Sequence, residues 1–308
     1  MMSKKKATLI GLIAVLLWAS IVALIRGVSE RLGATGGAAM VYSVASVFLV
    51  LTVRFPKLRD FPRAYLVWGS VLFVAYELCL SLSIGYANTG RQAIEVGMVN
   101  YLWPTLTLVS AIVFNRQRAN ALVVPGFALS MLGICWVLGG DRGLDLHGML
   151  ANVKDNPLSY GLALLGAFIW AAYCTVTARI AKGKNGVTLF FMLVSLALWL
   201  KYAFEGGGPM TFDLRAIVCL LLAAGAMGFG YAAWNVGILH GNVTVLAGAS
   251  YFIPVFSAAI AAALLHAPLS LPFWQGALMV CGGSILCWIA TRAGKPEAVR
   301  AVETGETS

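Results

Sequence analysis

Long apolar runs alternate with short polar segments along the whole chain. A run of about 20 apolar residues is long enough for an α-helix to cross the hydrocarbon core of a bilayer. The pattern predicts ten such helices and no separate soluble domain, so the expected fold class is an all-α integral membrane protein. The predicted spans are residues 8–25, 36–53, 64–87, 93–114, 119–138, 158–180, 187–204, 214–239, 243–265 and 272–292.

The composition agrees with this fold class. Of the 308 residues, 60% are apolar and 11% are charged, whereas a soluble domain carries about 25% charged residues. The net charge of +10 could indicate a nucleic-acid partner, but Lys and Arg gather near the chain ends and in the loops after the even-numbered spans. This bias is typical of cytoplasmic loops. We therefore expect a multi-pass protein in contact with membrane lipid, with both termini in the cytoplasm and no nucleic-acid partner.

The two halves of the chain repeat each other at an offset of about 150 residues. "NYLWPTLTLVSAI" (100–112) aligns with "SYFIPVFSAAIAA" (250–262). Because each half holds an odd number of spans, the second half enters the membrane in the opposite sense, as in many secondary transporters. We expect two inverted five-span repeats around a central cavity, residues 1–142 and 143–292, followed by a short cytoplasmic tail, 293–308. The matched pairs are Trp18 and Trp170, Arg63 and Arg215, Gly85 and Gly237, Tyr101 and Tyr251, Pro104 and Pro254, Gly126 and Gly276, and Gly133 and Gly283.

Pro104 and Pro254 lie in the middle of predicted spans, at equivalent positions of the two halves. Each proline removes a helical hydrogen bond and displaces the carbonyl one turn earlier. At membrane depth, such backbone is tolerated where it is buried in protein or lines a cavity. We interpret the pair as helix breaks or hinges beside a transported ligand, and the alternative is an ordinary kink of a membrane helix.

Glu77 lies near the middle of the third predicted span, where a charge is costly unless it faces protein or water. At about 100° per residue, Ser81 shares its face, so this span carries a polar stripe. The hypothesis is that Glu77 meets a ligand ammonium or carries a proton. The alternative is a protonated side chain bonded to a neighbouring helix. Glu95 follows Arg91 by four residues at the start of the fourth span, which indicates a helix cap or an ion pair.

Several aromatic and polar residues lie deep in the spans or beside polar positions. A cavity walled by aromatic rings with few polar groups suits a small ligand that has an apolar body and a polar head. Aromatic rings also attract a ligand ammonium, although plain helix packing is the alternative for each ring. The candidate substrate-binding residues are Trp18, Tyr76, Glu77, Ser81, Asn100, Trp103, Trp170, Tyr173, Tyr231, Asn235 and Tyr251.

A secondary transporter of a small amphiphilic metabolite fits these features best. The six cysteines lack metal-ligand spacing, and we expect no metal, no nucleotide and no other cofactor. An intramembrane enzyme is the alternative, because Gly248-Ala-Ser250 faintly resembles a serine protease motif. That chemistry needs a base at similar depth, and the histidines all lie in or beside loops: His147, His240 and His266.

Ten spans in two halves, with "YFIPVFSAAIAA" (251–262) in the ninth span, resemble the EamA type of the drug/metabolite transporter superfamily. Within it, the chain is most similar to bacterial exporters of aromatic amino acids. That likeness is carried by "GYANTGRQAIEVGMVNYLWPTLT" (85–107), "GICWVLGGD" (133–141) and "IWAAYCTVT" (169–177). Many EamA members end the fourth and ninth spans with a glutamate, but this chain has "FNRQRA" and "LLHAPLS" there, so no role is carried over for that acid.

The resemblance implies an exporter in the bacterial inner membrane that works by alternating access. It implies aromatic and other small amino acids as substrates, with toxic organic compounds as a further class. A different amphiphilic metabolite is the alternative substrate.

Overall fold

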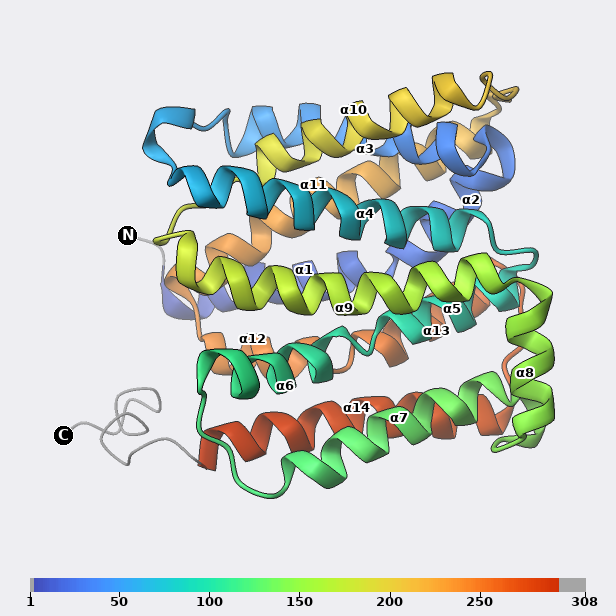
Figure 1. Cartoon of the computed structure of the whole chain (residues 1–308). Helices are drawn as coiled ribbons and strands as arrows, with labels where there is room; N and C mark the ends of the chain where they lie inside the picture. The colour runs from blue at the N-terminus through green and yellow to red at the C-terminus, as the bar shows by residue number, and fades with distance from the viewer. Residues whose placement is uncertain (1–2, 294–308) are drawn as a thin grey trace.

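The computed structural model describes residues 3–293, and this part of the chain is helical without any strand (Figure 1). Of the expected tail 293–308, only Ala293 falls inside the described residues. The helices are α1 (Lys4–Ala19), α2 (Ile21–Leu32), α3 (Ala34–Thr52), α4 (Ser70–Gly85), α5 (Gly90–Asn100), α6 (Trp103–Asn115), α7 (Val123–Leu138), α8 (Leu146–Asp155), α9 (Pro157–Ile180), α10 (Val187–Phe204), α11 (Leu214–His240), α12 (Val243–Ser250), α13 (Ile253–Leu264) and α14 (Leu271–Ala293). Three short turns add a 3₁₀ turn at Leu58–Asp60, a π turn at Tyr65–Gly69 and a 3₁₀ turn at Gly140–Arg142.

Polar side chains cap several helix starts. The first backbone N–H groups of a helix have no partner inside it, and Ser, Thr, Asn or Asp at the N-cap supplies an acceptor. Thr89 accepts from Gln92 at the start of α5, and Asn156 accepts from Ser159 at the start of α9. Asp213 does the same for α11. These caps fix where helices begin at the end of the bundle that also holds α8.

Seven helical segments of the described chain are long and apolar enough to cross a membrane, and α1 with α2 forms an eighth if this bent pair is one span. Two of the segments consist of two consecutive elements each. One is the π turn followed by α4, and the other is α5 followed by α6. Helices α7 and α13 are shorter apolar helices. The chain is thus an all-α, multi-pass membrane protein.

Three of the predicted spans are interrupted in the structure. The first bends by 41° at Ser20, between α1 and α2. The fourth ends α5 at Asn100 and begins α6 at Trp103, and the ninth ends α12 at Ser250 and begins α13 at Ile253. Both later breaks fall just before Pro104 and Pro254. Proline has no N–H to offer the carbonyl four residues earlier, so it leaves the carbonyls of Asn100 and Ser250 without their helical partner.

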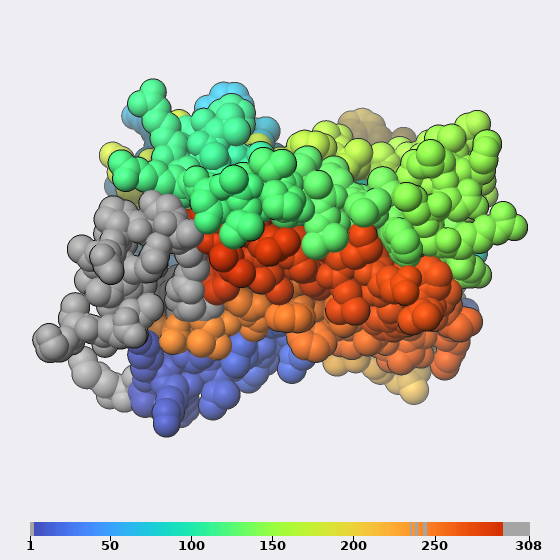
Figure 2. All heavy atoms as spheres, turned by 90° about the horizontal axis from the view of Figure 1, so that it is seen from below, coloured from blue at the N-terminus to red at the C-terminus, as the bar shows by residue number. Residues whose placement is uncertain are grey.

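The gap expected at 139–157 contains the short helix α8, which the hydrophobicity pattern did not predict. Figure 1 shows α8 lying across the bundle at one end, while the other helices run side by side along its length. Helix α1 begins and α14 ends at the opposite end (Figure 1). On the face seen in Figure 2, α14 lies between α7 and the α12–α13 pair. We call the two ends the α8 end and the N-terminal end.

Glycines let α7 and α14 pack with their backbones nearly touching. A Cβ atom at Gly133 would lie 2.7 Å from the carbonyl oxygen of Gly276, and one at Gly126 would lie 2.9 Å from that of Gly283. Without strong hydrophobic driving force between helices in lipid, such close approach through small residues is a main source of helix association. The α7–α14 pair therefore depends on these four positions.

We predict that Gly133→Ala destabilises the protein, because its methyl group meets the α14 backbone, which cannot move aside like a side-chain end. Overpacking of this kind costs about 1–3 kcal/mol. Gly161→Ala on α9 is the matched control, since nothing lies within 4 Å of the added atom. Thermal unfolding of the two purified variants in detergent measures the difference. Equal stability of the two variants would contradict this account of the α7–α14 contact.

Candidate functional site

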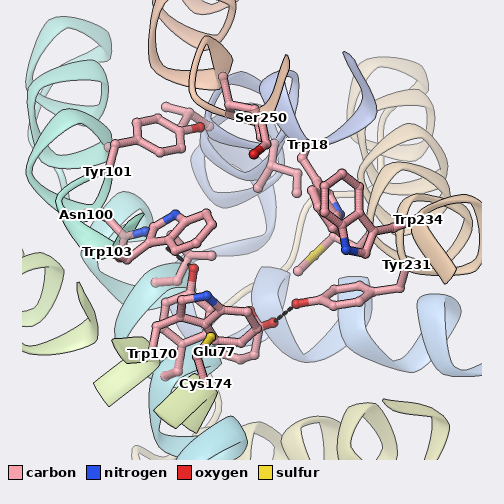
Figure 3. Close-up of a pocket in the computed structure, with 17 residues that line it drawn as sticks. Trp18, Glu77, Asn100, Tyr101, Trp103, Trp170, Cys174, Tyr231, Trp234 and Ser250 are labelled. Atoms are coloured by element: carbon pink, nitrogen blue, oxygen red, sulfur yellow. Dashed lines mark hydrogen bonds between the residues drawn. The ribbon is translucent and has the colours of Figure 1, made fainter. Parts of the chain in front are cut away.

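A cavity of about 260 Å³ is lined by described residues of nine helices, α1, α2, α4, α5, α6, α9, α11, α12 and α13 (Figure 3). Most of the wall is aromatic or aliphatic, with Glu77 as its charged group and no Lys, Arg or His among the described lining residues. The lining consists of Trp18, Ile21, Val22, Tyr76, Glu77, Leu80, Gly97, Asn100, Tyr101, Trp103, Trp170, Cys174, Met227, Tyr231, Trp234, Ser250 and Ile253.

Glu77 is 1% exposed on α4 and accepts hydrogen bonds on both carboxylate oxygens. Tyr42 of α3 donates its hydroxyl to Oε2 at 2.6 Å, and Tyr231 of α11 donates to Oε1 at 3.2 Å (the latter is dashed in Figure 3). Burying a carboxylate is very costly unless hydrogen bonds replace the lost water. The two hydroxyls supply that replacement, and among the described ion pairs none involves Glu77.

Two groups of aromatic rings face each other across the cavity (Figure 3). The first comprises Tyr76, Trp103 and Trp170, with ring centroids 4.4 Å apart for Tyr76–Trp170 and 6.2 Å for Trp103–Trp170. The second comprises Trp18, Tyr231 and Trp234, with Trp18 lying 5.2 Å from each of the other two rings. Ring pairs at such distances attract each other in edge-to-face or offset geometry, so both walls are held in place without a ligand.

Asn100 ends α5 at the helix break and is 3% exposed. Its Nδ2 donates to the hydroxyl of Tyr76 at 3.4 Å. Its Oδ1 has no hydrogen-bond partner in the described structure, and neither has Nε1 of Trp18. A buried polar atom without a partner costs about 1–3 kcal/mol, so the residues that line the cavity include an acceptor on Asn100 and a donor on Trp18 that a polar ligand can use.

The structure brings most of the predicted site residues together. Seven of them line the cavity: Trp18, Tyr76, Glu77, Asn100, Trp103, Trp170 and Tyr231.

Three other predicted residues lie outside the lining. Ser81 donates to the backbone carbonyl of Glu77, Tyr173 packs its ring on Trp170 at 4.9 Å, and Tyr251 packs against Trp288. The side chain of Asn235 lies outside the described part of the structure.

Sequence reasoning missed Tyr42 and Trp234. Trp234 follows Tyr231 by three residues and shares its helix face, which is a signal that could have found it. Tyr42 lies in an apolar run whose sequence does not distinguish it from its neighbours. Its role depends on a contact with another helix.

Glu95 lies away from the cavity, in a polar network near the α8 end. It accepts from Nε of Arg91 at 3.1 Å and from the hydroxyl of Tyr160 at 2.7 Å. Arg91 also bonds the carboxylate of Asp141 at 2.8 Å, and this guanidinium lowers the pKa of that carboxyl. The network fits the expectation of an ion pair at a helix start.

The described residues contain no group of three or more His, Cys, Asp or Glu that could hold a metal ion. Ser250 lines the cavity, but its hydroxyl donates to the carbonyl of Ala247 at 2.8 Å. No described basic side chain lines the cavity to activate it. The arrangement is suited to binding a ligand by contact and charge.

Apolar helices of membrane-spanning length around an aromatic cavity define a multi-pass membrane protein with an internal pocket. Comparison with known sequences makes the class specific: the chain belongs to the EamA-like transporter family, whose profile matches residues 157–289. The family resemblance expected from the sequence is thereby confirmed.

Three known relatives span nearly the whole chain, and each is named as the aromatic amino acid exporter YddG. The protein of Escherichia coli strain K12 is 59% identical, over 95% of this chain and 100% of its own length. That of Salmonella typhimurium is 60% identical, over 94% and 99%, and that of Ancylobacter novellus is 26% identical, over 94% and 100%. A solved structure titled only as the crystal structure of a protein matches with a TM-score of 0.66 over 95% of this chain, at 22% identity. That match supports the fold alone.

Cys174 provides a test of the cavity itself. It lines the wall, whereas Cys281 is 2% exposed on α14 and lies outside the lining. In two variants that each retain one of these cysteines, we expect a small thiol reagent to modify Cys174 faster than Cys281, since only the first borders open space. Mass spectrometry of the intact proteins over time gives both rates. Equal rates would show that the cavity is not open to small molecules.

Proposed function

We propose that this protein exports aromatic and other small amino acids across the bacterial inner membrane by alternating access. The observation that carries the proposal is the central cavity, in which aromatic rings surround a single carboxylate. An aromatic amino acid has a ring for such walls and an ammonium for such a charge. The relatives of 59% and 60% identity, named as aromatic amino acid exporters, support the same substrate class.

The cavity dimensions support a small substrate. Pockets for drug-sized ligands measure about 300–1,000 Å³, and this cavity of about 260 Å³ lies just below that range. A single amino acid between the Trp170 wall and the Trp18 wall is of suitable size. On this proposal the substrate-binding residues are the seven predicted ones that line the cavity, joined by Trp234.

We further propose ten membrane spans arranged as two inverted repeats, residues 1–142 and 143–292, with both termini and the tail 293–308 in the cytoplasm. Support comes from the glycine contacts of α7 and α14. In the repeat, Gly126 matches Gly276 and Gly133 matches Gly283. In the structure the contacts are crossed: Gly126 faces Gly283, and Gly133 faces Gly276. A two-fold axis between antiparallel helices gives reciprocal contacts of this kind.

The interrupted helices support the alternating mechanism. Transporters often place broken helices at the midplane, where the free backbone lines the ligand cavity. Asn100 and Ser250, the last residues of α5 and α12, both line the cavity here. We propose that Pro104 and Pro254 act as hinges at which the half-helices reorient when access changes sides.

We propose a transporter without enzymatic activity, cofactor, nucleotide or nucleic-acid partner. An intramembrane hydrolase would need a base beside Ser250, and its hydroxyl points instead to a backbone carbonyl. Export of a different amphiphilic metabolite remains the alternative, and the transport assay below distinguishes it.

We expect the purified protein in proteoliposomes to exchange labelled phenylalanine for internal unlabelled phenylalanine. Trp170→Ala removes the ring shared by both contacts of the first wall, so we expect the KM for phenylalanine to rise about three- to tenfold. Trp68→Ala is the control, because this tryptophan is 57% exposed and lies outside the lining. No exchange of any amino acid by the folded wild type would contradict the proposed function.

The topology is tested with Arg54→Cys and Lys182→Cys, which follow the second and sixth predicted spans. Both exposed positions should react with a membrane-impermeant thiol reagent from the cytoplasmic side only. Lys154→Cys on α8 should react only from the other side. Reaction of the first two cysteines from opposite compartments would exclude the inverted arrangement.

A further inference from the structure

Both oxygens of Glu77 are engaged by tyrosine hydroxyls, yet the carboxylate is not saturated. Tyr42 and Tyr231 each donate one hydrogen bond to it. An ionised carboxylate offers about four lone-pair positions, so two donors leave capacity for a further donor from the cavity. The described lining provides no Lys, Arg or His, so a cationic ligand would bring the positive charge that the side chains around Glu77 do not supply.

The two hydroxyls differ in how a ligand can affect them. Tyr231 lines the cavity and makes the longer bond, so an arriving donor can share or replace it. Tyr42 is 0% exposed, lies outside the lining and packs its ring 5.4 Å from that of Phe191. No ligand in the cavity reaches its hydroxyl. Tyr42 therefore holds Oε2 of Glu77 in one position whether or not a ligand is bound.

The neighbouring groups suit an organic ammonium. A primary ammonium carries three donors on one atom, and the same cavity lining holds a second acceptor, Oδ1 of Asn100, which is buried and has no partner in the described structure. Asn100 donates to the hydroxyl of Tyr76 at 3.4 Å, and Tyr76 precedes Glu77 on α4. The rings of Tyr76 and Trp170 add faces that attract a cation.

We propose that Glu77 and Asn100 form the subsite for the ammonium group of a zwitterionic ligand, and that Tyr42 is the positioning residue that orients the Glu77 carboxylate toward it. This inference rests on the proposed function in taking the ligand to be an amino acid. It adds which group of the substrate, the ammonium, the protein recognises. It also assigns a role to Tyr42, which does not contact the substrate.

Three related ligands separate this role from a general effect on the protein. Phenylalanine carries both charged groups, 2-phenylethylamine keeps only the ammonium, and 3-phenylpropionate keeps only the carboxylate. Binding of each to the purified full-length protein in detergent is measured by calorimetry for the wild type, Tyr42→Phe and Glu77→Gln. Tyr160→Phe is the matched control, since it removes a tyrosine–carboxylate bond of 2.7 Å to Glu95, away from the cavity.

We expect Tyr42→Phe to weaken binding of phenylalanine and 2-phenylethylamine by about tenfold, the effect of one hydrogen bond to a charged group. Binding of 3-phenylpropionate should not change. Glu77→Gln should weaken the two ammonium ligands at least as much and should leave 3-phenylpropionate unchanged or tighter, because a like charge is removed. In the Glu77→Gln background, Tyr42→Phe should have no further selective effect. Tyr160→Phe should leave all three affinities unchanged.

Other outcomes overturn the inference. Equal losses for all three ligands in Tyr42→Phe would assign Tyr42 a structural role only. Unchanged affinity for both ammonium ligands in Glu77→Gln, together with lost transport, would make Glu77 a proton carrier instead. If the wild type binds phenylalanine and these variants bind it equally well, the inference fails while the proposed function stands. If the wild type binds none of the three, the proposed function fails as well.

Discussion

The buried carboxylate of Glu77 sets the arrangement of the middle of the bundle. A charge at this depth is tolerated only with hydrogen-bond donors around it, and its two donors come from two other helices, α3 and α11, which pack against each other. The ring of Phe191 lies 5.4 Å from the ring of Tyr42 and 5.4 Å from that of Tyr231, so it packs against both donors. Moving α3, α4 or α11 would separate the Glu77 carboxylate from a donor, so the packing of these three helices depends on this side chain.

A bundle with a cavity at its centre needs close packing elsewhere. The glycine contacts of α7 and α14 provide this close packing outside the cavity lining. There the two backbones lie so close that an added Cβ atom would collide with the facing helix. Near the cavity the helices are instead interrupted at Asn100 and Ser250, and large aromatic rings fill the remaining space. Close backbone packing and the cavity thus lie in different parts of the bundle: small residues fix the α7–α14 pair, and broken helices with bulky rings surround the cavity.

The sequence predicted the membrane class and much of the cavity, because both depend on signals that one helix carries. Glu77 and Asn100 are polar residues in apolar runs, and Trp170 lies deep in its span. Ser81 shows the limit of that reasoning: helical periodicity placed it beside Glu77, but its hydroxyl bonds its own helix backbone. Tyr42 could not be predicted, since its contact joins residues 35 positions apart through the packing of two helices. Helix α8 was missed although Asp145 caps it, because only half of its ten residues are apolar and they form no run long enough to predict a span.

The charge in the cavity belongs to one half of the chain only. At the offset of 152 that relates Gly85 to Gly237, the counterpart of Glu77 is Phe229, which is 42% exposed and stacks on Phe48. If the halves are related by the proposed repeat, the scaffold is nearly symmetric but its binding site is not. On the proposed function one carboxylate satisfies the single ammonium of an amino acid, and an acid at the exposed position of Phe229 would lie outside the cavity lining. On the proposed function, the asymmetry of the ligand therefore matches an acid at this depth in one half only.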